Sequence, residues 1–536
     1  MKDIELPLGS RSDPTTLRRR TTATTPLGPL PVDRSTDRRV VTPKRARSVF
    51  RPATVVAGCV SRLFACAGLA ILLSASGIAQ AATPHDALSV LERAATFFRD
   101  RLGVEGTYVW RYSADGTVRM GEGGKVPSSI GWVEPPGTPA IGAAFLRLHQ
   151  ITGQPEWLEA ARTVAEALVR TQLVSGGWFY KIETSPELVG QWCYRSLDAG
   201  KKCPDAEDNP NRNRTVLDDN TTQSVLNFLM WFDEASAHSV PAVDEAIKKG
   251  LKRLMKAQYA NGAFPVFFTN KIPGQDVPSA AEATMPDSWS RTWIKPTTAP
   301  YFVTNDNLPR NVGRSFLNAY RLYGKDQYLA TARRVGDFLL AAQLPAPQRG
   351  WSQQYDRTMQ PVWGRKFEPP AVVSHETAGC IEYLIELSGE TGERKYLDAA
   401  RSAADWLEAV RLPDGNWARF YELKTDRPLY VDNENRLTFS DDDLLGHYGM
   451  KGQFEIPKVL ARLRSIEKGA PIVPEKLWVS EADELDPSEL SAQAQAFVDG
   501  IDAQGRWADD GWIDGRRFMQ GVFVLARFFE DNGDGP

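Results

Sequence analysis

The sequence has few residues of the kinds that bind transition metals. Its 536 residues include 5 cysteines and 5 histidines, and the histidines, at positions 85, 149, 238, 375 and 447, are scattered along the chain. No two cysteines form a Cys-x-x-Cys pair. Because zinc and related metals are held by clustered Cys and His ligands, the sequence argues against a transition-metal centre.

Long hydrophobic runs are also missing. The apolar run Leu63–Leu73 is too short to cross a bilayer, and it is followed by Ala79-Gln80-Ala81, which has the pattern of a signal-peptidase site. The preceding residues are rich in Arg, Thr and Pro, which predicts disorder. We therefore interpret residues 1–81 as a basic, disordered leader and signal region of a secreted or periplasmic protein. An uncleaved N-terminal anchor is the alternative.

Basic residues are outnumbered by acidic residues once the leader is set aside. The net charge falls from −3 for the whole chain to about −11 for residues 82–536, which argues against nucleic acid as a partner. A polyanionic substrate would then need local arginine clusters or a bound cation. Cys193 and Cys203 flank a nine-residue loop and can form a disulfide in an oxidising compartment, whereas Cys380 is predicted to be a buried thiol.

A repeated unit is present from residue 85 onward. Each unit has a helix, a short turn, an amphipathic helix and a loop in which glycine precedes an aromatic residue or lies close to one. The aromatic anchors of these loops lie 86, 87 and 66 residues apart, at Trp178, Phe264, Trp351 and Trp417. Apolar residues at helical spacing and a regular recurrence are typical of helical repeat proteins.

These units predict an all-α protein in which residues 82–536 form one domain, with residues 470–536 as the last helix pair. Helix pairs stack into a solenoid or close into an α/α toroid or partial barrel. We favour the toroid because it gathers the loops into a shared cleft. Trp351 and Tyr355 would then line a groove for sugars, and the alternative is that they pack between helix pairs.

Acidic and amide residues precede two of the predicted helices. Asp218-Asp219-Asn220 comes before the apolar run Val225–Phe232, and Asp306-Asn307 comes before another helical run. One such residue is enough to cap a helix, whereas several oxygen ligands together suit Ca²⁺. We expect Asp219 and Asp306 to bind the cation, with Asn220 beside them and Asp218 as the cap. Arg365 and Arg419, in later loops, can pair with sugar carboxylates.

Six motifs follow one another along the chain, at Leu217–Gln223, Ala257–Pro265, Thr304–Asp306, Gly350–Asp356, Arg365–Pro370 and Trp417–Glu422. Together they resemble the pectic acid (pectate) lyases of polysaccharide lyase family ten over residues 130–450. The resemblance implies a toroid-like enzyme, expected to be a monomer, that cleaves polygalacturonate by β-elimination with Ca²⁺. It makes Arg365 the catalytic base and Arg419 a ligand of the substrate carboxylate, with Arg427 and Arg436 as further candidates.

The chain departs from the family pattern after residue 422. The family has a further arginine in a Gly-Arg-Asp-Gly turn and a later Arg-rich turn, where this chain has Tyr430–Arg436 and Leu444–Gly449. Fewer arginines indicate weaker binding of polygalacturonate or a different uronate polymer. Two other functions stay open: an α/α-toroid glycoside hydrolase that pairs Asp219 with Glu368 or Glu422, and a non-catalytic glycan-binding protein.

Overall fold

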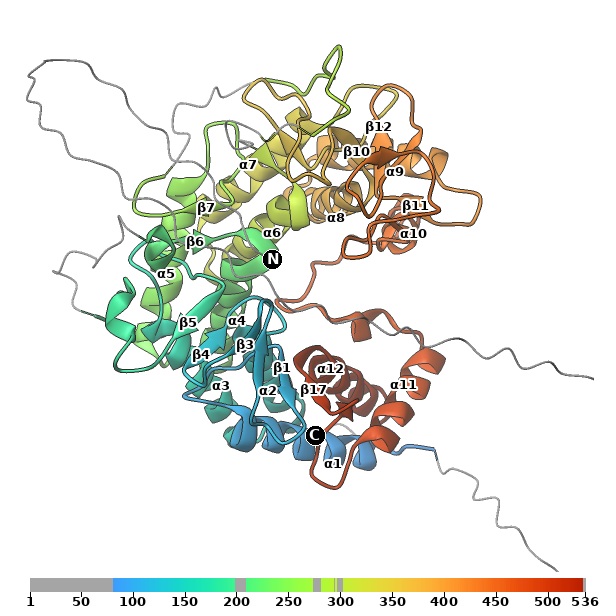
Figure 1. Ribbon diagram of the computed structural model, residues 1–536. Coiled ribbons are helices and arrows are strands. Elements are labelled where there is room, and N and C mark those ends of the chain that lie inside the picture. Colours follow the sequence, from blue (N-terminus) through green and yellow to red (C-terminus); the bar gives the residue numbers. More distant parts are fainter. Residues whose placement is uncertain (1–80, 198–208, 273–280, 294, 296–301, 534–536) are drawn as a thin grey trace, which may run out of the picture. The chain divides into compact units, whose positions relative to one another are not determined.

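A computed structural model describes residues 81–197, 209–272, 281–293, 295 and 302–533. Residues 81–536 belong to one compact unit, which contains every helix and strand given below (Figure 1). The predicted leader lies outside the described residues. Within the described ranges, none of the helices combines the length and the apolar character needed to span a membrane.

Four helix pairs make up most of this unit. They are α2 with α3 (Thr138–Thr152, Pro155–Arg170), α4 with α5 (Thr221–Ala235, Pro241–Ala257), α6 with α7 (Leu308–Tyr323, Asp326–Ala342), and α8 with α9 (Ser374–Thr391, Arg394–Ala409). The remaining helices are α1 (Pro84–Phe97), α10 (Ile456–Glu467), α11 (Pro487–Gly500) and α12 (Gly515–Asn532).

The even-numbered helices form an inner layer in which α12, α2, α4, α6, α8 and α10 pack each against the next. The odd-numbered helices α3, α5, α7 and α9 cover this layer from outside. At the C-terminal end, α12 packs against both α1 and α11. The fold is therefore mostly helical and α/α-toroid-like, which confirms the predicted fold class and the final helix pair.

Local sequence explains why the helices come in pairs. The inner helices α2, α6 and α8 end at Gly153, Gly324 and Gly392, each in the left-handed conformation that glycine adopts without strain. The next helix begins within two or three residues, so the two helices run antiparallel. An inner helix packs against its partner and both neighbours, which is why α8 is buried on nearly all sides.

The aromatic residues of the loops are structural. Trp178, Trp351 and Trp417 are buried, and each indole Nε1 donates to a leucine carbonyl near the end of the preceding outer helix. The Tyr355 hydroxyl donates to the Ala342 carbonyl at 2.8 Å. The prediction that Trp351 and Tyr355 line a sugar groove is therefore wrong, because both side chains are fully buried and satisfied within the core.

Three glutamines join successive helix pairs. The buried side chains of Gln172, Gln258 and Gln343 follow α3, α5 and α7, and each Nε2 donates twice. One hydrogen bond goes to the loop after its own helix, and the other goes to the next outer helix, at Ala246, Thr331 or Ala399. The same contact thus recurs at three junctions of the repeat.

Short strands lie in the connections and at the C-terminal end, where the sequence predicted none. β1, β2, β3, β16 and β17 form one sheet in the order β16-β17-β1-β2-β3, which joins the C-terminal end to the N-terminal end. Their bounds are Arg111–Ser113, Arg119–Gly121, Gly124–Val126, Ala508–Asp509 and Trp512–Asp514. A second sheet has the order β10-β12-β13-β14, with bounds Ala371–Val373, Phe420–Glu422, Pro428–Val431 and Leu437–Thr438.

The remaining strands form two-stranded pairs. These are β4 with β5 (Ile130–Trp132, Lys181–Glu183), β6 with β7 (Thr215–Val216, Phe267–Phe268), β8 with β9 (Phe302–Val303, Gln354–Tyr355) and β11 with β15 (Trp417–Ala418, Lys451–Gly452). Strands β4, β6 and β8 are each separated from the following inner helix by four or five residues, whereas β10 leads directly into α8. The residues between strand and helix therefore occupy equivalent positions in successive repeats.

The structure confirms one of the two cysteine predictions, the one for Cys380. Cys193 is disulfide-bonded, while its predicted partner Cys203 lies outside the described residues, so that pairing stays a prediction. Cys380 is a buried free thiol, as expected from its position in a helix.

Candidate carboxylate and arginine site

Two turns of the same conformation precede α4 and α6. They are the single 3-10 turns η4 (Asp218–Asn220) and η5 (Asn305–Asn307), and they pack against each other. Asp219 and Asp306 have φ angles of 47° and 50°, and the asparagine after each is also left-handed. Non-glycine residues rarely adopt this conformation, and such strained positions cluster at functional sites. The predicted equivalence of the two turns is confirmed.

The acidic residues of the first turn do not cap the helix. Neither α4 nor α6 has a side-chain cap hydrogen bond. An N-cap normally has an extended backbone that directs its side chain over the first helical turn, and a left-handed residue lacks that geometry. Asp218 instead accepts a hydrogen bond from the Tyr180 hydroxyl at 2.9 Å. The prediction that Asp218 is the cap is therefore wrong.

Three carboxylates converge at these turns. Asp218, Asp219 and Asp306 each place one oxygen within 4.8 Å of the others. Burial, and then the charge of Asp218, raises the pKa of Asp219 to about 7. Burial and the charges of Asp219 and Asp218 hold the pKa of Asp306 well above its usual range. The ionised cluster therefore needs a compensating positive charge.

Glu134 is a further acidic residue of this site that was not predicted from the sequence. It lies in the loop between β4 and α2, which is the position that Asp219 and Asp306 occupy in the next two repeats. Burial, and then the charges of Asp219 and Glu122, raises the pKa of Glu134 to about 9. The feature of the sequence that could have identified Glu134 is its position in the loop before a repeat helix, like the positions of Asp219 and Asp306.

The donor set of the cluster fits a hard divalent cation. Ca²⁺ takes oxygen ligands in flexible geometry, and carboxylates are its preferred protein ligands. Asp218, Asp219 and Asp306 would hold the ion, and their mutual repulsion would be relieved by it. The calcium-binding role stays a prediction, now with Asp218 added to Asp219 and Asp306.

Arg365 is the positive charge beside this cluster. Its charge opposes part of the rise in the pKa values of Asp218, Asp219 and Asp306, as expected of a guanidinium near these carboxylates. Its guanidinium donates to Glu368 Oε1 from Nε at 2.8 Å and from Nη2 at 2.5 Å. Burial alone would lower the pKa of Arg365, but the hydrogen bonds and charge of Glu368 raise it above its ordinary value.

Arg419 is linked to the same site through a buried network. Its Nη1 lies 3.6 Å from Glu376 Oε1, and its Nε donates to the Gly449 carbonyl at 2.6 Å. Gln353 Nε2 donates to Glu376 at 2.9 Å and to Asn305 Oδ1, next to Asp306, at 2.8 Å. Glu376 and Gln353 thus join Arg419 to Asn305 of the η5 turn.

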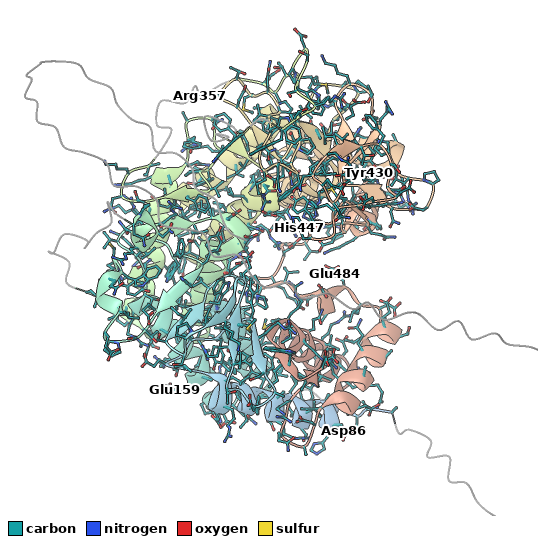
Figure 2. The ribbon with its side chains drawn as sticks, viewed as in Figure 1. Asp86, Glu159, Arg357, Tyr430, His447 and Glu484 are labelled. Carbon is teal, nitrogen blue, oxygen red and sulfur yellow. The ribbon has the colours of Figure 1, made fainter. Side chains whose placement is uncertain are left out.

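Tyr448 contacts both arginines. Its ring centroid lies 5.6 Å from Arg365 Cζ and 4.6 Å from Arg419 Cζ, within the range of cation–π interactions. Phe367 packs on the Tyr448 ring at 4.9 Å and on His447 at 5.3 Å; His447 is labelled among the side chains of Figure 2. The segment Leu444–Gly449, where the resembling family has arginine, therefore supplies an aromatic support in this chain.

Two of the predicted arginines do not join the site. Arg427 is exposed and lies over Phe439, with its Cζ 3.6 Å from the ring centroid. Arg436 pairs with Asp432 and Glu434 of its own turn, at 2.8 Å each, and is 71% exposed. These local contacts occupy both side chains. The structure therefore does not bring Arg427 or Arg436 to the carboxylate cluster, whereas Asn220 lies directly beside Asp219.

Comparison with known proteins adds only a loose likeness of fold. No protein-family model matches the chain, and no curated protein matches it. A variant of a family 10 polysaccharide lyase from Cellvibrio cellulosa, solved with trigalacturonic acid, is 17% identical at a TM-score of 0.40; the match covers 61% of this chain and 99% of that one. A GH76 α-mannanase from Bacteroides thetaiotaomicron is 12% identical at a TM-score of 0.41, covering 82% of this chain and 94% of that one.

A D-mannose isomerase is also similar, at 13% identity and a TM-score of 0.41, covering 62% of this chain and 73% of that one. These three structures are carbohydrate-active enzymes of different reaction types, a lyase, a hydrolase and an isomerase. At such identities and TM-scores they do not assign an activity. The choice between activities therefore depends on the residues of the site.

Proposed function

We propose that the protein is an exported lyase that cleaves polygalacturonate, or a related uronate polysaccharide, by calcium-assisted β-elimination. The observation that carries this proposal is the convergence of Asp218, Asp219 and Asp306 beside Arg365, with Arg419 joined to the same site through Tyr448. Carboxylates for a cation and arginines for anionic sugars are the two groups that a uronate polymer requires.

The chemistry explains why these residue types are needed. β-Elimination removes the proton at C5, next to the uronate carboxylate, and expels the oxygen at C4. Negative charge develops on the carboxylate during this step, so it must be stabilised by fixed positive charges. A bound Ca²⁺ would supply Lewis-acid stabilisation. Arg419 would bind and orient a carboxylate of the polymer through paired hydrogen bonds.

We propose Arg365 as the base, provided that its ion pair with Glu368 is broken first. A guanidinium held by a carboxylate stays protonated, so Arg365 must leave Glu368 before it can accept the C5 proton. A bound Ca²⁺ and the nearby Arg419 would disfavour the charged form of Arg365. Arg365→Lys and Arg365→Ala are expected to lower kcat by at least about 100-fold, the usual size of a lost acid–base group.

The experiment that tests the lyase follows the ultraviolet absorbance of the unsaturated product during incubation with polygalacturonate and Ca²⁺. We expect an absorbance rise that a chelator abolishes and added Ca²⁺ restores. Lys366→Ala is the matched control for the Arg365 variants, because Lys366 is exposed and next in sequence. No absorbance rise under any metal condition would rule the lyase out, and near-normal turnover by Arg365→Ala would remove Arg365 from the base role.

A glycoside hydrolase is the second candidate, and the raised pKa of Glu134 favours it. A carboxyl group whose pKa is about 9 is protonated at neutral pH and can act as a general acid. Asp219 would be its partner, because the charge of Asp219 acts on Glu134. Glu422, considered earlier, is unsuitable, since Arg291 and Thr425 occupy its carboxylate. New reducing ends without ultraviolet absorbance, lost in Glu134→Gln, would indicate hydrolysis.

A further inference from the structure

A cavity with a volume of 420 Å³ lies within the inner layer, next to the carboxylate cluster. Its walls come from α2, α4, α6 and α12 and from the segment 477–485, which connects α10 to α11. At one end it is lined by Asn220 and by Pro135, the residues adjacent to Asp219 and Glu134 in the chain. Its volume is in the range of small-ligand sites, roughly 300–1,000 Å³.

The wall of this cavity is rich in amides. Asn227 of α4 and Asn311 and Asn318 of α6 face it, and Asn318 Nδ2 donates to Asn227 Oδ1 at 3.4 Å. An amide offers both donors and acceptors, which is the combination that binds the hydroxyl groups of sugars. Trp478 of the connecting segment adds an aromatic face, a surface on which the apolar side of a sugar ring packs.

Two arginines line the cavity, and they differ in their partners. Arg314 is paired with Glu386 at 3.3 Å and also with Glu475, so its charge is already compensated. Arg516, at the start of α12, is exposed. Within the part of the chain that the structure describes, Arg516 forms no ion pair, and its guanidinium is therefore available to an anionic ligand.

We propose that this cavity is a binding site for a uronate-containing oligosaccharide, with Arg516 pairing the carboxylate of one sugar unit. The proposal rests on the proposed function, because the cavity is lined by the chain neighbours of Asp219 and Glu134 and would hold the part of the same polymer that extends from the carboxylate cluster. The amides of α4 and α6 bind the hydroxyl groups, and Trp478 packs on a ring. Arg516 thus supplies a carboxylate-binding arginine in place of Arg427 and Arg436, which do not reach the site.

The test measures binding separately from turnover. Trigalacturonate is titrated into the full protein by calorimetry, in the presence of a chelator so that no cleavage occurs. We expect Arg516→Ala to raise the Kd about tenfold, the effect of losing about 1.4 kcal/mol of binding energy. Arg517→Ala is the matched control, since Arg517 is the next residue but does not line the cavity; it should stay within about twofold. Thermal unfolding checks that both variants are folded.

A second variant tests the charge of the ligand. Glu481 also lines the cavity and accepts a hydrogen bond from Gln520 at 3.1 Å. Glu481→Gln removes a negative charge that repels a uronate, so it should tighten trigalacturonate binding. Cellotriose, a neutral trisaccharide, should bind at least about tenfold more weakly than trigalacturonate to the wild-type protein. Equal binding of the two would overturn the assignment of an anionic ligand.

The outcomes separate this inference from the proposed function. In an active lyase, Arg516→Ala should raise KM for oligogalacturonates and leave kcat unchanged. Lyase activity with unchanged Kd and KM in Arg516→Ala would overturn the cavity site while the proposed function stands. Trigalacturonate binding that depends on Arg516, in a protein without lyase activity, would support the cavity site and reject the lyase.

Discussion

At the scale of single residues, Tyr448 is the side chain that links the two arginines of the site. Arg365 and Arg419 come from separate loops, and Tyr448 contacts both guanidinium groups. The Tyr448 hydroxyl also accepts from Gln353 Nε2 at 2.8 Å and lies 3.4 Å from Glu368 Oε1. One side chain therefore joins both arginines to the network that reaches the η5 turn.

Substituting Tyr448 tests this arrangement. Tyr448→Phe retains the ring and should preserve most of the activity on polygalacturonate. Tyr448→Leu removes the ring contacts and should raise KM several-fold, because each cation–π contact contributes about 1–2 kcal/mol when partly desolvated. Steady-state kinetics with both variants is the measurement. Equal kinetics of the Phe and Leu variants would show that the aromatic ring does not position the arginines.

Glu368 sets the protonation of Arg365, which gives a prediction for the pH profile. Its hydrogen bonds and charge raise the pKa of Arg365, and a base acts only when deprotonated. Glu368→Gln removes that charge and should lower the pKa of Arg365. The rise of kcat with increasing pH should therefore move to lower pH. If Arg365 only binds substrate, Glu368→Gln should change kcat without changing the pH at which kcat rises. The measurement is kcat against pH for both proteins.

Some residues of the site could be predicted from the sequence, and others could not. The loops between repeats contain Asp219, Asp306, Arg365 and Arg419, and each was predicted from its position there. For the two acidic residues the reason is geometric, because residues before successive repeat helices face the same end of the fold. The pattern of Trp351 and Tyr355 gave the wrong function, since a glycine followed by an aromatic residue is equally typical of a buried anchor. Only the tertiary contacts distinguish an aromatic anchor from an exposed sugar-binding surface.

At the scale of elements, the strand before each inner helix and the glutamine after each outer helix repeat the same geometry. Strands β6 and β8 fix the η4 and η5 turns in equivalent positions, and this brings Asp219 next to Asp306. The glutamines hold successive outer helices in register. The positions of the site residues therefore depend on contacts made well away from the site.

Removing one of these glutamines should destabilise the repeat. Gln258→Ala leaves the carbonyls of Gly262 and Thr331 without this donor, and we expect a loss of about 2 kcal/mol in the free energy of unfolding. Gln327→Ala, at an exposed position of α7, is the control and should change it by less than about 0.5 kcal/mol. Chemical denaturation measures both, and similar values for the two variants would contradict the structural role.

At the scale of the whole molecule, the buried carboxylates make stability depend on pH and on cations. The pKa of Asp219 rises from its usual value near 4 to about 7, and that of Glu134 to about 9. A carboxyl whose folded pKa is raised stabilises the protein at low pH and loses that contribution as pH rises through the folded pKa. The metal-free protein should therefore become less stable as pH rises through these values.

Thermal unfolding with and without Ca²⁺ measures this effect. In a chelator the Tm should fall between about pH 5 and pH 9, and Ca²⁺ should restore it at the alkaline end, because the ion binds deprotonated carboxylates of the folded state. Asp219→Asn should flatten the pH dependence and remove the response to Ca²⁺. A wild-type Tm that is constant with pH and insensitive to Ca²⁺ would argue against a cation site at this cluster.

The sequence by itself determined the helix-pair repeat, because apolar spacing, turn glycines and recurring aromatic anchors are local signals that each unit carries. It also indicated the two acidic turns, through their place before equivalent helices. The tertiary structure alone decided that Asp218 and Glu134 join the carboxylates, that Tyr448 supports both arginines, and that Arg516 faces the central cavity. These relations join residues far apart in the chain, and their distances depend on how the repeats pack, which no local pattern encodes.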